Sequence, residues 1–293
     1  MFRIFDTIGQ TFRLMGASWR VLQKDRELLL FPMLGVVSAI IVAAVFFVVA
    51  NAAGTFDRLG IEDASAADQL AGAADLSGAT VTPVDVALAV LLYFGVTFCI
   101  LYFNTALVAA ALERLRGGDP TISSGLRVAS SRIPSILGWA IITGTVGLIL
   151  RALSERSDNV LAKIVLRLIG GAWAAITFFV VPVLIVEGVG PWQAIKRSGS
   201  LLQHSWGEQF VANFGFGIFM FGAVLIGILF GVIFAAVNPL FGLAVGFAIV
   251  AIGATIVATL EGIFKAALYE HATGKVPAGF EDIDLRRTFA AKA

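Results

Sequence analysis

The sequence has little charge, little histidine and a single cysteine. Only 14% of its 293 residues are charged and 58% are apolar, whereas a soluble domain carries about 25% charged residues. This composition, with a mean hydropathy of +0.91, excludes a water-soluble globule. Cys99 stands alone, which excludes an internal disulfide and a cysteine-based metal cluster. We therefore expect one integral membrane domain over residues 1–293.

Recognisable catalytic patterns are also missing. The two histidines, His204 and His271, lack the HExxH or His/Cys spacing of a zinc site. No GxSxG elbow and no phosphate-binding GxxxxGK motif occurs. The 21 basic and 20 acidic residues nearly cancel, which gives no sign of nucleic-acid binding. We expect a protein that is not an enzyme and has no catalytic residues, metal ligands or cofactor.

Long apolar runs dominate what is present. A helix needs about 20 apolar residues to cross a hydrocarbon core of ~30 Å. The stretches that qualify are residues 28–50, 86–112, 133–150, 169–186, 210–237 and 240–260. They predict an all-α bundle of six transmembrane helices. Residues 51–83, rich in small residues and acids, are expected to form a flexible outer loop, and residues 270–293 a cytoplasmic tail.

The basic residues predict the orientation. Most of the 21 lie in the leader, in the connections after the second and fourth spans, and after the sixth span. Because Lys and Arg are enriched in cytoplasmic loops, we expect both termini in the cytoplasm and the protein in the inner or plasma membrane. The exceptions, which this orientation places outside, are Arg151, Arg156, Lys163 and Arg167.

An amphipathic segment precedes each odd-numbered span, beginning with an interfacial helix over residues 1–27. Apolar residues spaced three and four apart mark these segments: Phe5, Ile8, Phe12, Met15, Trp19 and Leu22; Ile122, Leu126, Ala129, Ile133 and Ile136; Trp192, Ile195, Gly199, Leu202 and Trp206. Each even-numbered span ends in an acid followed by Gly and Pro, at Glu113, Glu187 and Glu270. The pattern predicts three hairpin repeats, each entered through an interfacial helix.

Two interpretations of the basic surface stay open. We call Arg20, Arg127, Lys196 and Arg197 the basic collar. In the first interpretation the collar binds anionic lipid headgroups or docks a partner, either a second copy or another membrane protein. In the second interpretation these residues only fix the topology while the apolar stripes pack on the bundle. The first makes the protein an organiser or regulator of its partners.

Few polar residues fall inside the spans. Asn104 and Asn213 do, and Glu261 and Lys265 lie four apart near the end of the sixth span, where they share one helical face. They can neutralise each other or take part in an ion relay. A transport or permeability pathway for a small solute or lipid is therefore one alternative function.

An interfacial lipid-modifying enzyme is another alternative. It would use Glu113, Glu187 or His204 as an acid or base. Helix-end acids beside basic residues more often form local contacts, so this reading ranks third.

Small residues in the last two spans leave a further choice open. Gly227 and Gly231, and Gly242 and Gly246, have the four-residue spacing that lets helices approach closely. The spacing fits a homodimer seam and packing within one hairpin equally well.

Several segments resemble a family of uncharacterised bacterial and archaeal integral membrane proteins. They are residues 177–191, 194–198, 205–208, 138–139 and 114–121. The Glu-Gly and Ala-x-Lys-Arg-Ser run within them is also similar to the membrane domain that accompanies some glycerophosphodiester phosphodiesterases. The resemblance implies a multi-pass inner-membrane protein with no assigned catalytic residues to carry over.

Overall fold

The computed structural model describes residues 15–59, 80–157, 159–202 and 206–280, with only the helical path given over 206–215. Within these ranges the regular elements are all helical, as expected. A helix over residues 15–24 is followed by η1 (Arg26–Leu29), α2 (Leu30–Ala52), α3 (Thr55–Leu59), α5 (Pro83–Leu115), α6 (Ile122–Ser131), α7 (Ile133–Glu155), α8 (Val160–Ile176), α9 (Val180–Val186), α10 (Pro191–Leu202), α11 (Trp206–Ala235) and α12 (Pro239–Ala272). Residues 1–14 of the expected interfacial helix and 281–293 of the tail lie outside the described residues.

Six helical stretches are long and apolar enough to cross a membrane. They are Arg26–Ala52, Pro83–Leu115, Ile133–Glu155, Val160–Val186, Phe216–Ala235 and Pro239–Ala272. The prediction of six helices long and apolar enough to cross a membrane is confirmed. The helices α5 and α12 extend beyond the apolar runs, and their last turns carry the acids Glu113 and Glu270.

The fourth span is interrupted, whereas the sequence predicted continuous helix over residues 169–186. The helix begins earlier, at Val160, and α8 and α9 are separated by a turn at residues 177–179. Pro182 explains the break. It has no amide hydrogen, and its ring clashes with the carbonyl four residues earlier, that of Phe178, in a regular helix.

Buried residues concentrate at one end of the molecule, which we call the hub. It contains the helix of residues 15–24, the start of α2, the last turns of α5 and α12, and the helices α6, α9 and α10. Large side chains without access to solvent, such as Phe31, Phe179 and Phe264, lie here. Away from the hub the spans expose most of their apolar residues. The core therefore joins the ends of the spans rather than their middles.

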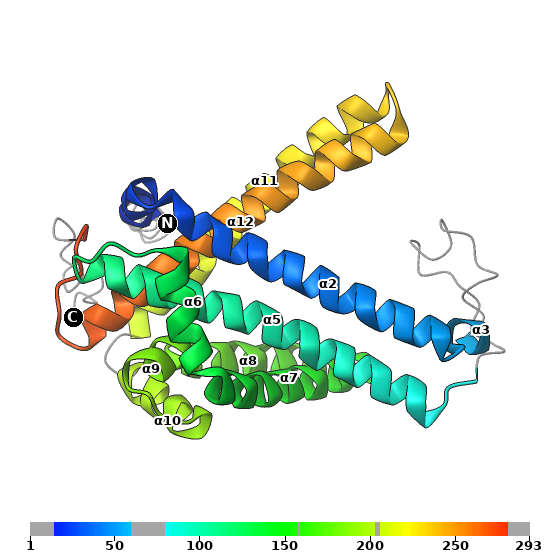
Figure 1. Ribbon diagram of the computed structural model, residues 1–293, viewed down its shortest axis with the longest axis horizontal. Helices are drawn as coiled ribbons and strands as arrows, with labels where there is room; N and C mark the ends of the chain where they lie inside the picture. Colours follow the sequence, from blue (N-terminus) through cyan, green and yellow to red (C-terminus); the bar gives the residue numbers. More distant parts are fainter. Residues whose placement is uncertain (1–14, 60–79, 158, 203–205, 281–293) are drawn as a thin grey trace.

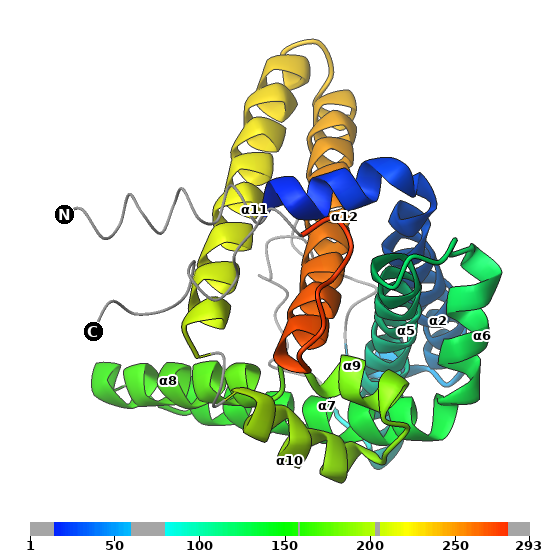
Figure 2. The ribbon, with the colours of Figure 1, turned by 90° about the vertical axis from the view of Figure 1, so that its left-hand side faces the viewer.

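The hairpins leave the hub in different directions. Figures 1 and 2 show α2 beside α5, while the α11–α12 hairpin turns away from them and the α7–α8 pair takes a third course. Another helix precedes each of α2, α7 and α11 along the chain. These are residues 15–24, α6 and α10, respectively. The description of these units as sequence repeats stays a prediction.

Glycine ends the helices where the sequence predicted it would. Gly117, Gly188 and Gly274 have φ of +86°, +67° and +84°. This left-handed conformation is strained for residues with a Cβ atom. It lets the chain turn back within four residues of each of the helix-end acids.

The glycines of the last hairpin pack within it. A Cβ atom on Gly242 would lie 2.4 Å from the carbonyl oxygen of Gly231, and one on Gly246 would lie 2.9 Å from that of Gly227. These contacts join α11 to α12 at backbone distance. Of the two uses left open by the spacing, the structure therefore accounts for these glycines by packing inside the hairpin.

Candidate functional site

A buried carboxylate links the first and third hairpins at the hub. The side chain of Glu270, near the end of α12, is only 2% exposed. Its Oε1 accepts hydrogen bonds from Nε and Nη2 of Arg116 at 3.0 and 2.6 Å, and Nζ of Lys275 lies 3.3 Å from Oε2. Arg116 follows the last turn of α5. The pair therefore fastens the end of α5 to the end of α12.

A second carboxylate brings in the middle hairpin. Glu187 follows α9, and its Oε1 accepts a hydrogen bond from Nε of Arg197 on α10 at 2.9 Å. The hydroxyl of Tyr269, beside Glu270 on α12, donates to the same oxygen at 3.4 Å. The hydrogen bond that Arg197 donates to Glu187 raises the pKa of Arg197 above its usual value. Together Glu187 and Glu270 connect the ends of all three hairpins.

The start of α2 is held by a third group. Arg114 on α5 pairs with Asp25, a buried residue just before η1, and with Asp119 at 2.9 Å. On the same turn of α5, Glu113 accepts a hydrogen bond from the hydroxyl of Ser124 on α6 at 2.7 Å. Glu113 and Glu187 thus bind residues near them in the sequence, whereas Glu270 binds Arg116 across two hairpins.

The collar residues fall into two groups. Arg197 is engaged by Glu187, and Nη2 of Arg20 donates to the carbonyl oxygen of Gly279 at 3.3 Å. Arg127 on α6 and Lys196 on α10 are exposed and have no ion pair with the described residues. Nζ of Lys196 lies 5.8 Å from the ring centre of Trp192. Two of the collar cations are therefore open to an external anion.

The polar residues predicted inside the spans are only partly brought together. Glu261 and Lys265 form an ion pair at 2.7 Å, and Nζ of Lys265 lies 5.5 Å from the ring centre of Phe178. Asn104 is half-buried on α5. The side chain of Asn213 and the whole of His204 lie outside the described residues.

Ser198 is a residue that the sequence reasoning missed. Its buried hydroxyl donates to the carbonyl oxygen of Ile176 at 2.6 Å and accepts from the backbone N–H of Phe179 at 3.0 Å. Both backbone groups are left without helical partners by the break between α8 and α9. An unpaired buried backbone group costs about 1–3 kcal/mol. The helix α10 is therefore bound into the interrupted span.

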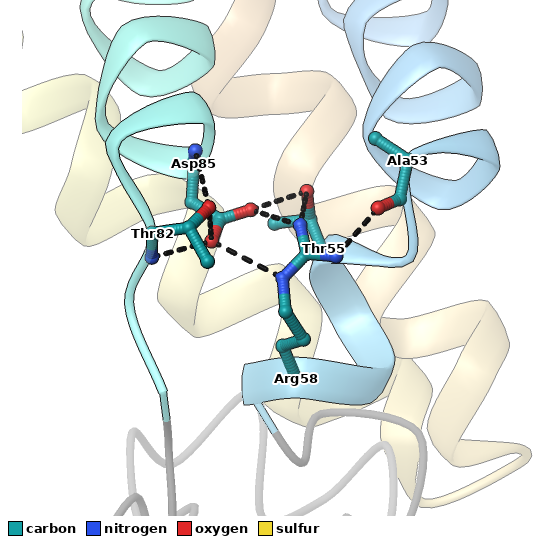
Figure 3. A network of polar contacts seen from close by, with 5 residues as sticks. All are labelled: Ala53, Thr55, Arg58, Thr82 and Asp85. Carbon is teal, nitrogen blue, oxygen red and sulfur yellow. Dashed lines mark hydrogen bonds and ion pairs between the residues drawn. The ribbon is translucent and has the colours of Figure 1, made fainter.

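A second polar network lies at the far end of α2 and α5 (Figure 3). The buried carboxylate of Asp85 accepts hydrogen bonds from the hydroxyls of Thr55 and Thr82 at 2.7 and 2.6 Å and from Nη2 of Arg58 at 2.6 Å. Nη1 of Arg58 also donates to the carbonyl oxygen of Ala53 at 2.6 Å. The hydrogen bond to Asp85 raises the pKa of Arg58.

This network orders both ends of the connection that the sequence predicted to be flexible over residues 51–83. The short helix α3 and the first turn of α5 meet there, and residues 60–79 lie outside the described residues. The sequence did contain a signal. Thr82 and Asp85 form a capping box, the Thr-x-x-Asp pattern that opens a helix before an apolar run.

Comparison with known proteins identifies one family that matches the chain. A family of unknown function, DUF6159, matches residues 84–279. The chain belongs to this family. No curated protein and no solved structure matches it.

The part of the chain that matches DUF6159 contains most of the hub. It runs from the start of α5 through α12 and includes Arg116, Glu187 and Glu270, whereas α2 and Arg58 precede it. The match confirms the expected membership of an uncharacterised family. The similarity to the membrane domain of glycerophosphodiester phosphodiesterases stays a prediction.

Proposed function

We propose that this DUF6159 protein is a non-enzymatic membrane protein that binds anionic phospholipid through the basic surface of its hub. The observation that carries the proposal is the pairing of Trp192 and Lys196 on α10. Trp192 is 63% exposed although it is the largest apolar side chain of its helix, and it lies beside an exposed cation. Trp and Lys at the end of apolar spans suit the headgroup region of a bilayer.

The rest of α10 supports the proposal because the helix is firmly fixed. Its residues Ala194, Ile195 and Leu201 are buried in the hub. Trp192 and Lys196 therefore stand on a rigid support. Near an anionic leaflet each basic residue contributes about 1 kcal/mol of attraction. Bound lipid, or a partner recruited with it, is how the protein would organise its surroundings.

We propose that the hub lies on the cytoplasmic side of a cell membrane. The support is the charge distribution: the hub carries Arg20, Arg127, Lys196 and Arg197, and basic residues are enriched on the cytoplasmic side. An even number of spans brings both termini to that side.

The proposal is tested by charge reversal. The double variant Lys196→Glu and Arg127→Glu is compared with Lys163→Glu and Arg167→Glu, which reverses two exposed cations on α8. Lipid binding is measured by native mass spectrometry in mild detergent with phosphatidylglycerol or phosphatidylcholine. We expect wild type and the α8 variant to retain phosphatidylglycerol preferentially and the hub variant to lose that preference. Equal retention of both lipids by the wild type would contradict the proposal.

A transport pathway is the second candidate, favoured by the interrupted fourth span. Discontinuous helices line the binding sites of many transporters. Here the break at Phe178 faces the ion pair of Glu261 and Lys265. Because Cys99 is the single cysteine, Cys99→Ser gives a thiol-free background in which to place Phe178→Cys.

A membrane-impermeant maleimide then separates the two candidates. If a water-filled pathway reaches the break, Phe178→Cys reacts from outside in intact cells. The control Glu155→Cys, at the exposed end of α7, reports that the reagent arrives. Labelling of the control alone would exclude a pathway to the break from that side.

A further inference from the structure

Arg132 occupies an unusual position at the junction of α6 and α7. Its side chain is half-buried, and its guanidinium lies against the backbone of Gly188. A Cβ atom on Gly188 would lie 2.8 and 2.9 Å from Nη2 and Nη1 of Arg132. Gly188 is therefore required twice, once for its φ of +67° and once for the space that the guanidinium uses.

The charge of Arg132 is not neutralised by any acid among the described residues. Glu187 is next to Gly188 in the sequence, but its Oε1 is occupied by Arg197 and Tyr269. At the hub Arg114 and Arg116 each have a carboxylate partner. A partly desolvated guanidinium without a counter-ion is unfavourable. An anion from outside the chain would remove that cost.

Contacts between α7 and α10 place further cations in the same region. A Cβ atom on Gly138 would lie 2.9 Å from Cγ of Pro191, so the first turn of α10 packs on the first turns of α7. That turn of α10 carries the exposed Trp192, with Lys196 one turn later. Arg127 is on α6, which leads directly into Arg132.

We propose that Arg132 binds the phosphate of an anionic phospholipid, with Lys196 and Arg127 as flanking cations. The inference rests on the proposed function and names the site at which the lipid is held. Guanidinium matches phosphate in a bidentate arrangement, which a lysine ammonium cannot reproduce. The guanidinium already lies against Gly188 before the ligand arrives. Trp192 would lie beside the glycerol and acyl region of the same lipid.

The test compares Arg132→Gln with Arg151→Gln. The control removes an exposed arginine of α7 that pairs with Glu155. Both variants, in the full chain, are titrated with phosphatidylglycerol in detergent, and binding is followed by native mass spectrometry. Because a hydrogen bond to a charged group is worth about 1.5–3 kcal/mol, we expect Arg132→Gln to bind at least roughly tenfold more weakly. Arg151→Gln should bind as the wild type does.

Further arms keep the inference falsifiable. If Arg132→Gln does not fold, Arg132→Lys keeps the charge, and its affinity should still fall because the bidentate contact is lost. Displacement of the lipid by millimolar inorganic phosphate would assign the site to free phosphate and overturn the inference.

The result also separates the site from the function. A wild type that prefers phosphatidylglycerol, together with Arg132 variants that bind as tightly, would overturn this site and leave the proposed function standing. A wild type without the preference would overturn both.

Discussion

Buried and exposed members of one ion pair respond differently to substitution. Glu270 is enclosed by the hub, whereas the side chain of Arg116 is 42% exposed. Loss of the carboxylate leaves an arginine that water can hydrate. Loss of the arginine leaves a carboxylate that water cannot reach and that keeps only Lys275. The buried member therefore depends on the exposed one.

We predict that Arg116→Ala destabilises the protein more than Glu270→Gln. The first change strands a buried charge and should cost about 3 kcal/mol, the lower end of the range for breaking a buried pair. The second keeps an oxygen that accepts from Arg116 and should cost about 1 kcal/mol. Thermal unfolding in detergent, followed by intrinsic fluorescence, measures both. The opposite order would show that Glu270 is hydrated in the native protein.

The sequence predicted some of these residues and not others. Glu113, Glu187 and Glu270 were recognisable as helix-end acids because each is followed by Gly and Pro. Their partners were not recognisable. Arg116 lies 154 positions from Glu270, and Ser198 lies 22 from Ile176. Contacts over such separations depend on how the helices are packed, which local patterns do not encode.

Helix boundaries, too, were predicted only where a local pattern determines them. The apolar runs predicted six spans because a bilayer sets their length. They did not predict the break after α8, since Pro182 stands in a run that is apolar on both sides and proline is tolerated in membrane helices when its freed groups are satisfied. The hydroxyl that satisfies them belongs to α10. A break of this kind can be predicted only when the positions of α10 and of the fourth span are both known.

The α11–α12 hairpin gives a prediction about close packing. Gly242→Ala places a methyl group 2.4 Å from the carbonyl oxygen of Gly231, and backbone on both sides must shift. We expect a loss of about 1–3 kcal/mol, as for overpacked cores. Gly222→Ala, on the same hairpin with nothing within 4 Å, is the control and should unfold at the wild-type temperature.

The outcome is measured as the apparent melting temperature of the two variants in the same detergent. Equal melting temperatures would mean that the two helices do not approach as closely as Gly242 and Gly231 require.

For the whole molecule, the position of the core predicts where stability comes from. Phe264 and Phe247 lie on the same helix, but the first is 1% exposed in the hub and the second 74% exposed near the far end. Phe264→Ala should cost about 3–5 kcal/mol, because it removes a buried ring and leaves a cavity. Phe247→Ala should cost little, since detergent or lipid covers that ring in both folded and unfolded states.

The two variants are compared by their apparent melting temperatures and by the fraction of protein that stays monodisperse after heating. Similar losses for both would mean that the outer parts of the spans contribute to the core as much as the hub does.

The network at Asp85 has a consequence for the length of the connection between α3 and α5. The backbone N–H of Thr80 donates to the carbonyl oxygen of Arg58 at 3.0 Å, so the described residues on the two sides of this connection are joined directly. Because the two ends of the connection are already joined, each doubling of its length adds only about 0.6 kcal/mol to the entropic cost of closing the loop. An epitope or small reporter domain inserted there would leave α2, α5 and the distant hub undisturbed.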